Sequence, residues 1–70
     1  MIRQSVSSSN LRSVGYDSSI ETLEIEFHSG SIYQYSNVPN TVHSALMVAS
    51  SHGQYFDAHI KNSYRYIKVR

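Results

Sequence analysis

Apolar and polar residues alternate most regularly over residues 22–28, where every second position is apolar and the others are polar or charged. This period of two is typical of a half-buried antiparallel strand. Ser29-Gly30 turns the chain and residues 31–36 return it, so the two segments are predicted to form a β-hairpin. A weaker strand is predicted over residues 9–16, and the turn-prone Asp17-Ser18-Ser19 ends it.

Two registers of this hairpin are compatible with the sequence, and they place Tyr33 and Tyr35 on opposite faces of the sheet. A two-residue loop, Ser29-Gly30, directs both tyrosines outward. A three-residue loop, His28-Ser29-Gly30, puts the glycine at the left-handed position of a G1 bulge and directs both tyrosines to the core. We favour the three-residue loop, because Ser-Gly is a poor pair for a type I′ turn whereas glycine suits the third loop position.

The second half of the chain changes to a helical period. Four apolar residues have the spacing of one helical stripe: Val42, Ala45, Leu46 and Ala49. A helix cannot begin before Pro39, because the residue before a proline avoids the helical region. Gly53 is predicted to end this helix in the left-handed conformation. A shorter helix is predicted over residues 54–62, with four residues on one side: Tyr55, Phe56, His59 and Ile60. Residues 64–69 are predicted to be extended, as a fourth strand.

These elements predict an α+β fold, an antiparallel meander of three to four strands with two short helices packed on one face. A chain of 70 residues buries about three-fifths of its unfolded surface, which is enough for one thin core. We expect residues 1–7 to be a flexible segment and residues 8–70 to form a single domain. Phe27 and Leu46 are expected in the core, and Tyr64 and Arg65 outside it. Any pocket is expected to be a shallow groove, since a deep cavity would need a second copy of the chain to close it.

The composition narrows the classes of function. The chain has no cysteine, so disulfides and thiolate metal sites are excluded. The histidines lack metal-ligand spacing, and there is neither a phosphate loop nor a nucleophile elbow. We therefore expect no enzyme activity, no metal and no cofactor. No apolar run is long enough to span a membrane, and no signal peptide is recognisable, which favours the cytoplasm.

Charge and tyrosine are unevenly distributed. The net charge is only +1, yet four of the six basic residues lie in the last ten positions and no acid follows Asp57. This basic tail either pairs with the acidic strand or forms an anion-binding edge. The six tyrosines either build the core or stack on bases beside the cations. The residues assigned to the candidate ligand-binding site are Tyr33, Tyr35, Tyr64, Arg65, Tyr66, Lys61 and Arg12.

A set of short motifs extends over residues 8–67: Gly15-Tyr16-Asp17, Gly30, Tyr33-x-Tyr35, Val38-Pro39, Leu46, Ser51-x-Gly53, Tyr55-Phe56, Ile60 and Tyr64. Their order and spacing resemble the KTSC domain, which occurs at the C-terminus of some lysyl-tRNA synthetases and free-standing in bacterial and phage proteins. Tyr33 and Tyr35 match the family's central Tyr-x-Tyr. The resemblance implies a bacterial or phage-encoded protein and, through the synthetases, RNA binding. It supplies no catalytic residues.

Three functions are consistent with this sequence. We favour a non-enzymatic module for a nucleotide-type ligand, in which a homo-oligomer closes the pockets, as in a phage protein that sequesters a small nucleotide signal. The alternatives are an RNA-binding module and a protein-interaction adaptor that uses an exposed strand edge. Binding about 6–10 phosphates takes as many cations as the whole chain has. The expected partner is therefore a small nucleotide or a short single-stranded RNA.

Overall fold

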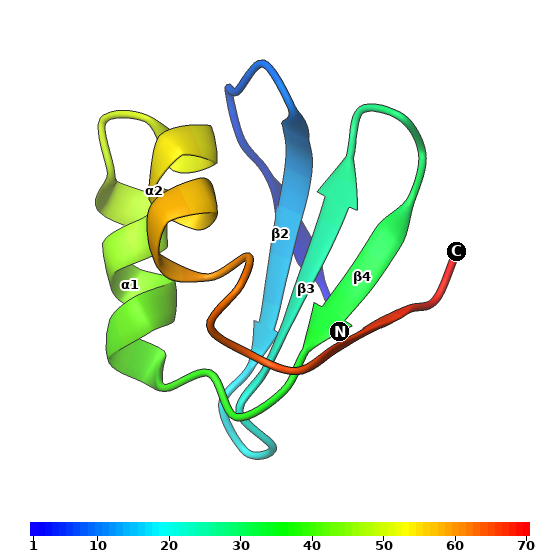
Figure 1. Cartoon of the computed structure of the whole chain (residues 1–70), viewed down its shortest axis with the longest axis vertical. Coiled ribbons are helices and arrows are strands. Elements are labelled where there is room, and N and C mark those ends of the chain that lie inside the picture. The colour runs from blue at the N-terminus through cyan, green and yellow to red at the C-terminus, as the bar shows by residue number, and fades with distance from the viewer.

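A computed structural model describes all 70 residues as one sheet and two helices. The elements in chain order are β1 (Arg3–Ser5), β2 (Leu11–Asp17), β3 (Thr22–Phe27), β4 (Ile32–Tyr35), α1 (Asn40–Val48), α2 (His52–His59) and β5 (Tyr66–Lys68). The strands form an antiparallel meander in the order β1-β2-β3-β4-β5. Both helices cover the same face of the sheet (Figure 1). The predicted α+β class is confirmed, with five strands in place of three to four.

The additional strand is β1, which lies within residues 1–7, where the sequence predicted no regular element. Its three residues show no apolar alternation, and it pairs with β2 through Arg3 and Gly15, Gln4 and Val14, and Ser5 and Ser13. The other four strands lie where the sequence placed them. β1 therefore owes its order to a partner strand and not to its own residue pattern.

The hairpin between β3 and β4 has the favoured three-residue loop. Ile25 pairs with Tyr33 across the two strands, and the Gly30 N–H donates to the Phe27 carbonyl at 2.9 Å. Gly30 has a φ of 96°, in the left-handed region that favours glycine. This register is confirmed, and it directs Tyr33 and Tyr35 to the side of the sheet that the helices cover.

Gly53 does not end α1, so that prediction was wrong. α1 ends at Val48, its C-cap residue Ala49 is extended, and Ser51 caps α2 by accepting a hydrogen bond from the Gln54 N–H at 3.3 Å. Gly53 is buried in the first turn of α2, which covers His52–His59 and not residues 54–62. A Cβ atom at this position would collide with the Asn10 side chain. A larger residue at position 53 would therefore displace the Asn10 side chain that lies against α2.

The core lies between the helices and the sheet. It is formed by nine buried residues: Leu11, Val14, Leu23, Ile25, Tyr35, Val38, Leu46, Phe56 and Ile60. Leu46 is buried as predicted, whereas Phe27 is half-buried and packs against the core from one side. Tyr64 also packs against this core, so the expectation that it lies outside was wrong. His59 is exposed, contrary to its predicted place beside Phe56, and Arg65 is exposed as expected.

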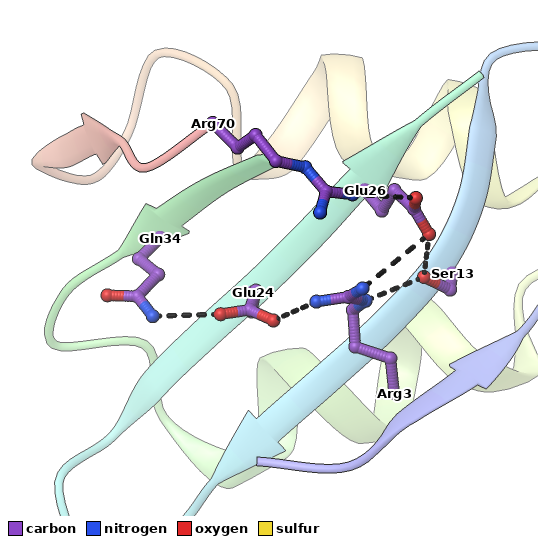
Figure 2. Close-up of polar contacts among 6 residues, drawn as sticks. All are labelled: Arg3, Ser13, Glu24, Glu26, Gln34 and Arg70. Atoms are coloured by element: carbon purple, nitrogen blue, oxygen red, sulfur yellow. Dashed lines mark hydrogen bonds and ion pairs between the residues drawn. The ribbon is translucent and has the colours of Figure 1, made fainter. Parts of the chain in front are cut away.

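The sheet face opposite the helices carries a connected polar network (Figure 2). Arg3 of β1 donates to a Glu24 carboxylate oxygen and, at 3.0 Å, to Ser13 Oγ, and Gln34 Nε2 donates to the other Glu24 oxygen at 2.8 Å. Glu24 is only 8% exposed. Burial alone would raise the pKa of Glu24, but the hydrogen bonds from Gln34 and Arg3 and the Arg3 charge outweigh it and lower this pKa.

The same network holds both ends of the sheet to β3 through Glu26. This carboxylate accepts a hydrogen bond from Ser13 Oγ at 2.8 Å and lies 3.8 Å from Arg3 Nη2 and 3.6 Å from Arg70 Nη2. Of the basic tail, only Arg70 pairs with the acidic strand. The remaining tail cations are thus available to other partners.

A histidine is held between α1 and β2 by stacking. The rings of Tyr16 and His43 are nearly parallel, at 9°, with centroids 4.5 Å apart, and the Tyr16 hydroxyl donates to the Val38 carbonyl at 2.6 Å. Burial lowers the pKa of His43, because the charged imidazolium loses hydration there. Folding therefore favours the neutral form of this side chain.

The lowered pKa of His43 predicts that the free energy of unfolding falls as the pH drops below about 6.5, the usual value for histidine. In that window the unfolded chain takes up the proton before the folded protein does, until the pH passes the folded pKa. His43→Phe keeps a ring against Tyr16 but cannot titrate, so its stability should change less. Urea denaturation of both proteins between about pH 7 and pH 5 gives the change of unfolding free energy with pH for each. The same change with pH in both proteins would contradict this prediction.

Candidate functional site

A groove of about 370 Å³ opens beside α2, over β4 and β5. Its lining includes five aromatic residues from four different elements: Phe27, Tyr33, Tyr35, Phe56 and Tyr66. Tyr66 is brought to Tyr35 by the pairing of β5 with β4, because directly paired residues share one face of a sheet. The aromatic character of the groove thus depends on the C-terminal strand.

The rings pack on one another in a defined order. Tyr35 is buried at the floor, Tyr33 is half-buried, and Tyr66 is 56% exposed at the rim. The Tyr66 ring centroid lies 5.6 Å from those of Tyr33 and Tyr35, and Phe27 meets Tyr33 edge-on at 86°. Burial, with the neighbouring Tyr33 and Tyr66, raises the pKa of Tyr35 to about 12. Its hydroxyl therefore stays protonated at neutral pH.

The polar lining is neutral overall. It consists of two carboxamides, two hydroxyls and one charge of each sign: Asn10, Asn62, Ser29, Ser31, Asp57 and Lys61. The Asn62 carboxamide offers donors and an acceptor, whereas Asn10 Oδ1 already accepts a hydrogen bond from Ser8 Oγ at 3.0 Å and leaves mainly its N–H donors for a ligand. Asp57 and Lys61 balance each other within the groove. Such a surface suits a planar ligand with mixed hydrogen-bonding edges better than a densely charged one.

The structure brings together part of the predicted site. Four of the predicted residues line the groove (Tyr33, Tyr35, Lys61 and Tyr66) and three do not (Arg12, Tyr64 and Arg65). Tyr64 packs against the core, and Arg65 is exposed just before β5. Arg12 is exposed at the irregularity of β2, where its carbonyl accepts the Val6 N–H at 3.1 Å. A binding role for each of these residues stays a prediction.

Several residues in or beside the groove are not predicted as site residues from the sequence. Asn10 and Asn62 carry no sequence signal, because they lie far apart along the chain and meet only in the fold. Lys68 pairs with Tyr33, so its side chain projects from the groove face of the sheet beside Tyr66. The spacing of Tyr66 and Lys68 in an extended segment could have revealed that shared face.

The four histidines are engaged separately. His28 and His52 each hydrogen-bond a backbone carbonyl, at 2.9 and 2.8 Å, and the other two pack against tyrosine rings. No group of three or more histidine, aspartate or glutamate side chains is placed to hold a metal ion. Neither helix has the length and apolar character needed to cross a membrane.

Some known proteins are similar to this chain over their full length, and others are larger enzymes that are similar over a short part of their length. A protein of Stutzerimonas stutzeri is 44% identical over 70 residues, which is 99% of each chain. A lysine–tRNA ligase of Trichormus variabilis is 49% identical over 51 residues, 73% of this chain but 9% of the ligase. A lysine–tRNA ligase of Nostoc sp. is 45% identical over 56 residues, 80% of this chain and 10% of the ligase.

A solved structure and a family model agree with these relatives. The crystal structure of a KTSC domain protein from Yersinia pestis matches with a TM-score of 0.96 and 42% sequence identity, over 99% of this chain and 97% of the other. The KTSC domain family model matches residues 7–64. This span includes the Tyr33-x-Tyr35 motif at the floor of the groove. The chain therefore belongs to the KTSC domain family.

Proposed function

We propose that this protein is a non-enzymatic module that binds the base of a nucleotide-type ligand in the groove between α2, β4 and β5. The observation that carries this proposal is the set of tyrosine rings at the groove, with Tyr66 exposed above Tyr33 and Tyr35. An exposed aromatic face stacks on a base. Asn10 and Asn62 supply donors and acceptors for the edge of that base.

Charge sets the number of phosphates that the site can hold. Lys61 is the only cation in the groove lining, and Asp57 offsets it. Lys68 adds one positive charge on the same face of the sheet. We therefore favour a nucleoside or a nucleotide with few phosphates, in the cytoplasm of a bacterial or phage-infected cell. A homo-oligomer would pool cations and cover the open side of the groove, as sequestration of a nucleotide signal requires.

The proposal is tested by titrating isotope-labelled protein with the four ribonucleoside 5′-monophosphates and following amide chemical shifts. We expect at least one of them to cause saturable shifts at Tyr33, Tyr66 and Asn62. Ribose 5-phosphate, which lacks the base, should cause none. The proposal fails if no monophosphate shifts these amides at millimolar concentration, or if ribose 5-phosphate acts equally well. Native mass spectrometry of the same sample reports whether a homo-oligomer forms.

Short single-stranded RNA is the second candidate, and the similarity to lysine–tRNA ligases favours it. Lys61, Arg65 and Lys68 form no ion pair in the fold, so they are free to contact phosphates. For single-stranded RNA, three such contacts predict that the logarithm of the binding constant falls with the logarithm of the salt concentration with a slope of about −2. Binding of a short RNA with that slope, but no binding of monophosphates, would select this function.

A further inference from the structure

β5 ends the sheet, and no strand pairs with its outer edge. Figure 1 shows this C-terminal segment, in red, running beside β4. The Arg65 carbonyl accepts the Ser36 N–H at 2.9 Å, and the Val69 N–H donates to the Ile32 carbonyl at 2.8 Å. Backbone groups in an antiparallel strand alternate between its two neighbours. Those of Tyr66 and Lys68 therefore point away from β4, toward an open position.

This edge carries free positive charge and apolar surface. Arg65 and Lys68 make no ion pair, and no acidic residue follows Asp57. The side chain of Ile67 is 61% exposed. A strand placed here would meet two backbone donors, two backbone acceptors and one cation on each face of the sheet, Lys68 on the groove face and Arg65 on the other. The β1 edge differs, because its only charge, Arg3, is already held by Glu24 and Glu26.

A second copy of β5 does not suit this edge. Two antiparallel β5 strands would bring two basic segments close together with no acidic residue between them, so their charges would repel one another. An acidic strand would instead place carboxylates beside Arg65 and Lys68. The charge of the edge thus selects the sign of its partner.

We propose that the outer edge of β5 binds an acidic peptide segment in extended conformation, which adds a sixth strand to the sheet. The backbone N–H and C=O groups of Tyr66 and Lys68 supply the hydrogen bonds, and the flanking cations supply the selectivity. This surface adjoins the groove but binds through different groups, since a peptide would use the outward backbone N–H and C=O of Tyr66 and Lys68, whereas a base would use the Tyr66 ring. If no nucleotide binds in the groove, the proposal that the β5 edge binds a peptide is unaffected.

The test uses a short capped peptide in which pairs of glutamates alternate with pairs of valines, so that carboxylates lie on both faces of the added strand. The peptide with lysine in place of each glutamate is its charge control. Saturation with the glutamate peptide should slow amide hydrogen exchange at Tyr66 and Lys68 at least about tenfold, because both amides become hydrogen-bonded. Exchange at Ser5, on the β1 edge, should not change. Equal binding of both peptides, no saturable binding at millimolar concentration, or protection at Ser5 would each overturn the proposal.

Two substitutions at one position separate backbone pairing from charge. Lys68→Ala removes the charge and should weaken binding about threefold, as a cross-strand pair does. Lys68→Pro also removes the outward N–H but no hydrogen bond to β4, and proline is tolerated at strand edges. It should weaken binding at least about tenfold. Ser5→Pro, the matched change on β1, should bind the peptide as the unchanged protein does.

A charge reversal keeps the proposal testable if the proline variant does not fold. Lys68→Glu should lower the preference for the glutamate peptide over the lysine peptide at least about fivefold, since one favourable contact becomes repulsive. An unchanged preference would overturn the assignment of the acidic partner to this edge. Equal affinity of Lys68→Ala and a folded Lys68→Pro would show that the strand is not added through the backbone.

Discussion

Tyr66→Ala is expected to weaken binding of a nucleotide-type ligand by a factor of about 5 to 150. Stacking of a base on an aromatic side chain contributes about 1–3 kcal/mol, and Tyr66 presents the most exposed ring at the groove. The side chain is 56% exposed, so its loss should change the stability of the fold little. The measurement is the affinity for whichever monophosphate shifts the groove amides of the unchanged protein.

Two matched variants identify the origin of that loss. Tyr66→Phe keeps the ring and should retain most of the affinity. Ile67→Ala alters the same strand, but on the opposite face, and should bind normally. If Ile67→Ala weakens binding as much as Tyr66→Ala does, the loss comes from disturbance of β5 and not from stacking. Wild-type affinity in Tyr66→Ala would remove the groove as the binding site.

Leu46→Ala is expected to reduce the free energy of unfolding by about 2–5 kcal/mol. Leu46 is fully buried at 0% exposure and is the only buried residue of α1. Its removal leaves a cavity where the helix meets the sheet. A domain of this size has a total stability of about 4–10 kcal/mol, so the variant should be partly unfolded or much easier to denature. Urea denaturation followed by circular dichroism measures the change.

Val48→Ala is the control on the same helix. Val48 is 83% exposed, and its shortening should alter the stability by no more than about 0.5 kcal/mol. The sequence predicts Phe27 in the core with Leu46, but Phe27 is half-buried. Phe27→Ala should therefore lower the free energy of unfolding less than Leu46→Ala does. Similar losses for Leu46→Ala and Val48→Ala would show that α1 does not depend on its buried side.

The elements that the sequence predicts correctly are those whose conformation depends on residues close together in the chain. Alternation within β3 defines its core face, and Gly30 defines the loop, because only a residue that tolerates a φ of 96° suits that position. Together they determine the hairpin register, and so the side of the sheet that Tyr33 and Tyr35 face. The helical spacing of the apolar residues from Val42 to Ala49 places α1 in the same way.

Other features depend on partners that lie far away in the chain. The sequence predicts Gly53 as a helix end, yet in the fold Gly53 lies in the first turn of α2 with the Asn10 side chain packed against it. The strand β1 forms through pairing with β2 and through the contacts of Arg3 with the acids of β3. Neither partner can be identified from residues next to the element itself.

The class of fold, the hairpin and the resemblance to the KTSC domain can all be predicted from the order of residues, because period, turn chemistry and motif spacing are encoded within short segments. Which candidate residues come together depends on the packing of distant segments. This packing groups Lys61 with the tyrosines of β4 and β5 and leaves Arg12, Tyr64 and Arg65 outside the groove. The physical reason is that strand order and helix packing set distances between segments, and those distances leave no trace in the local pattern of residues.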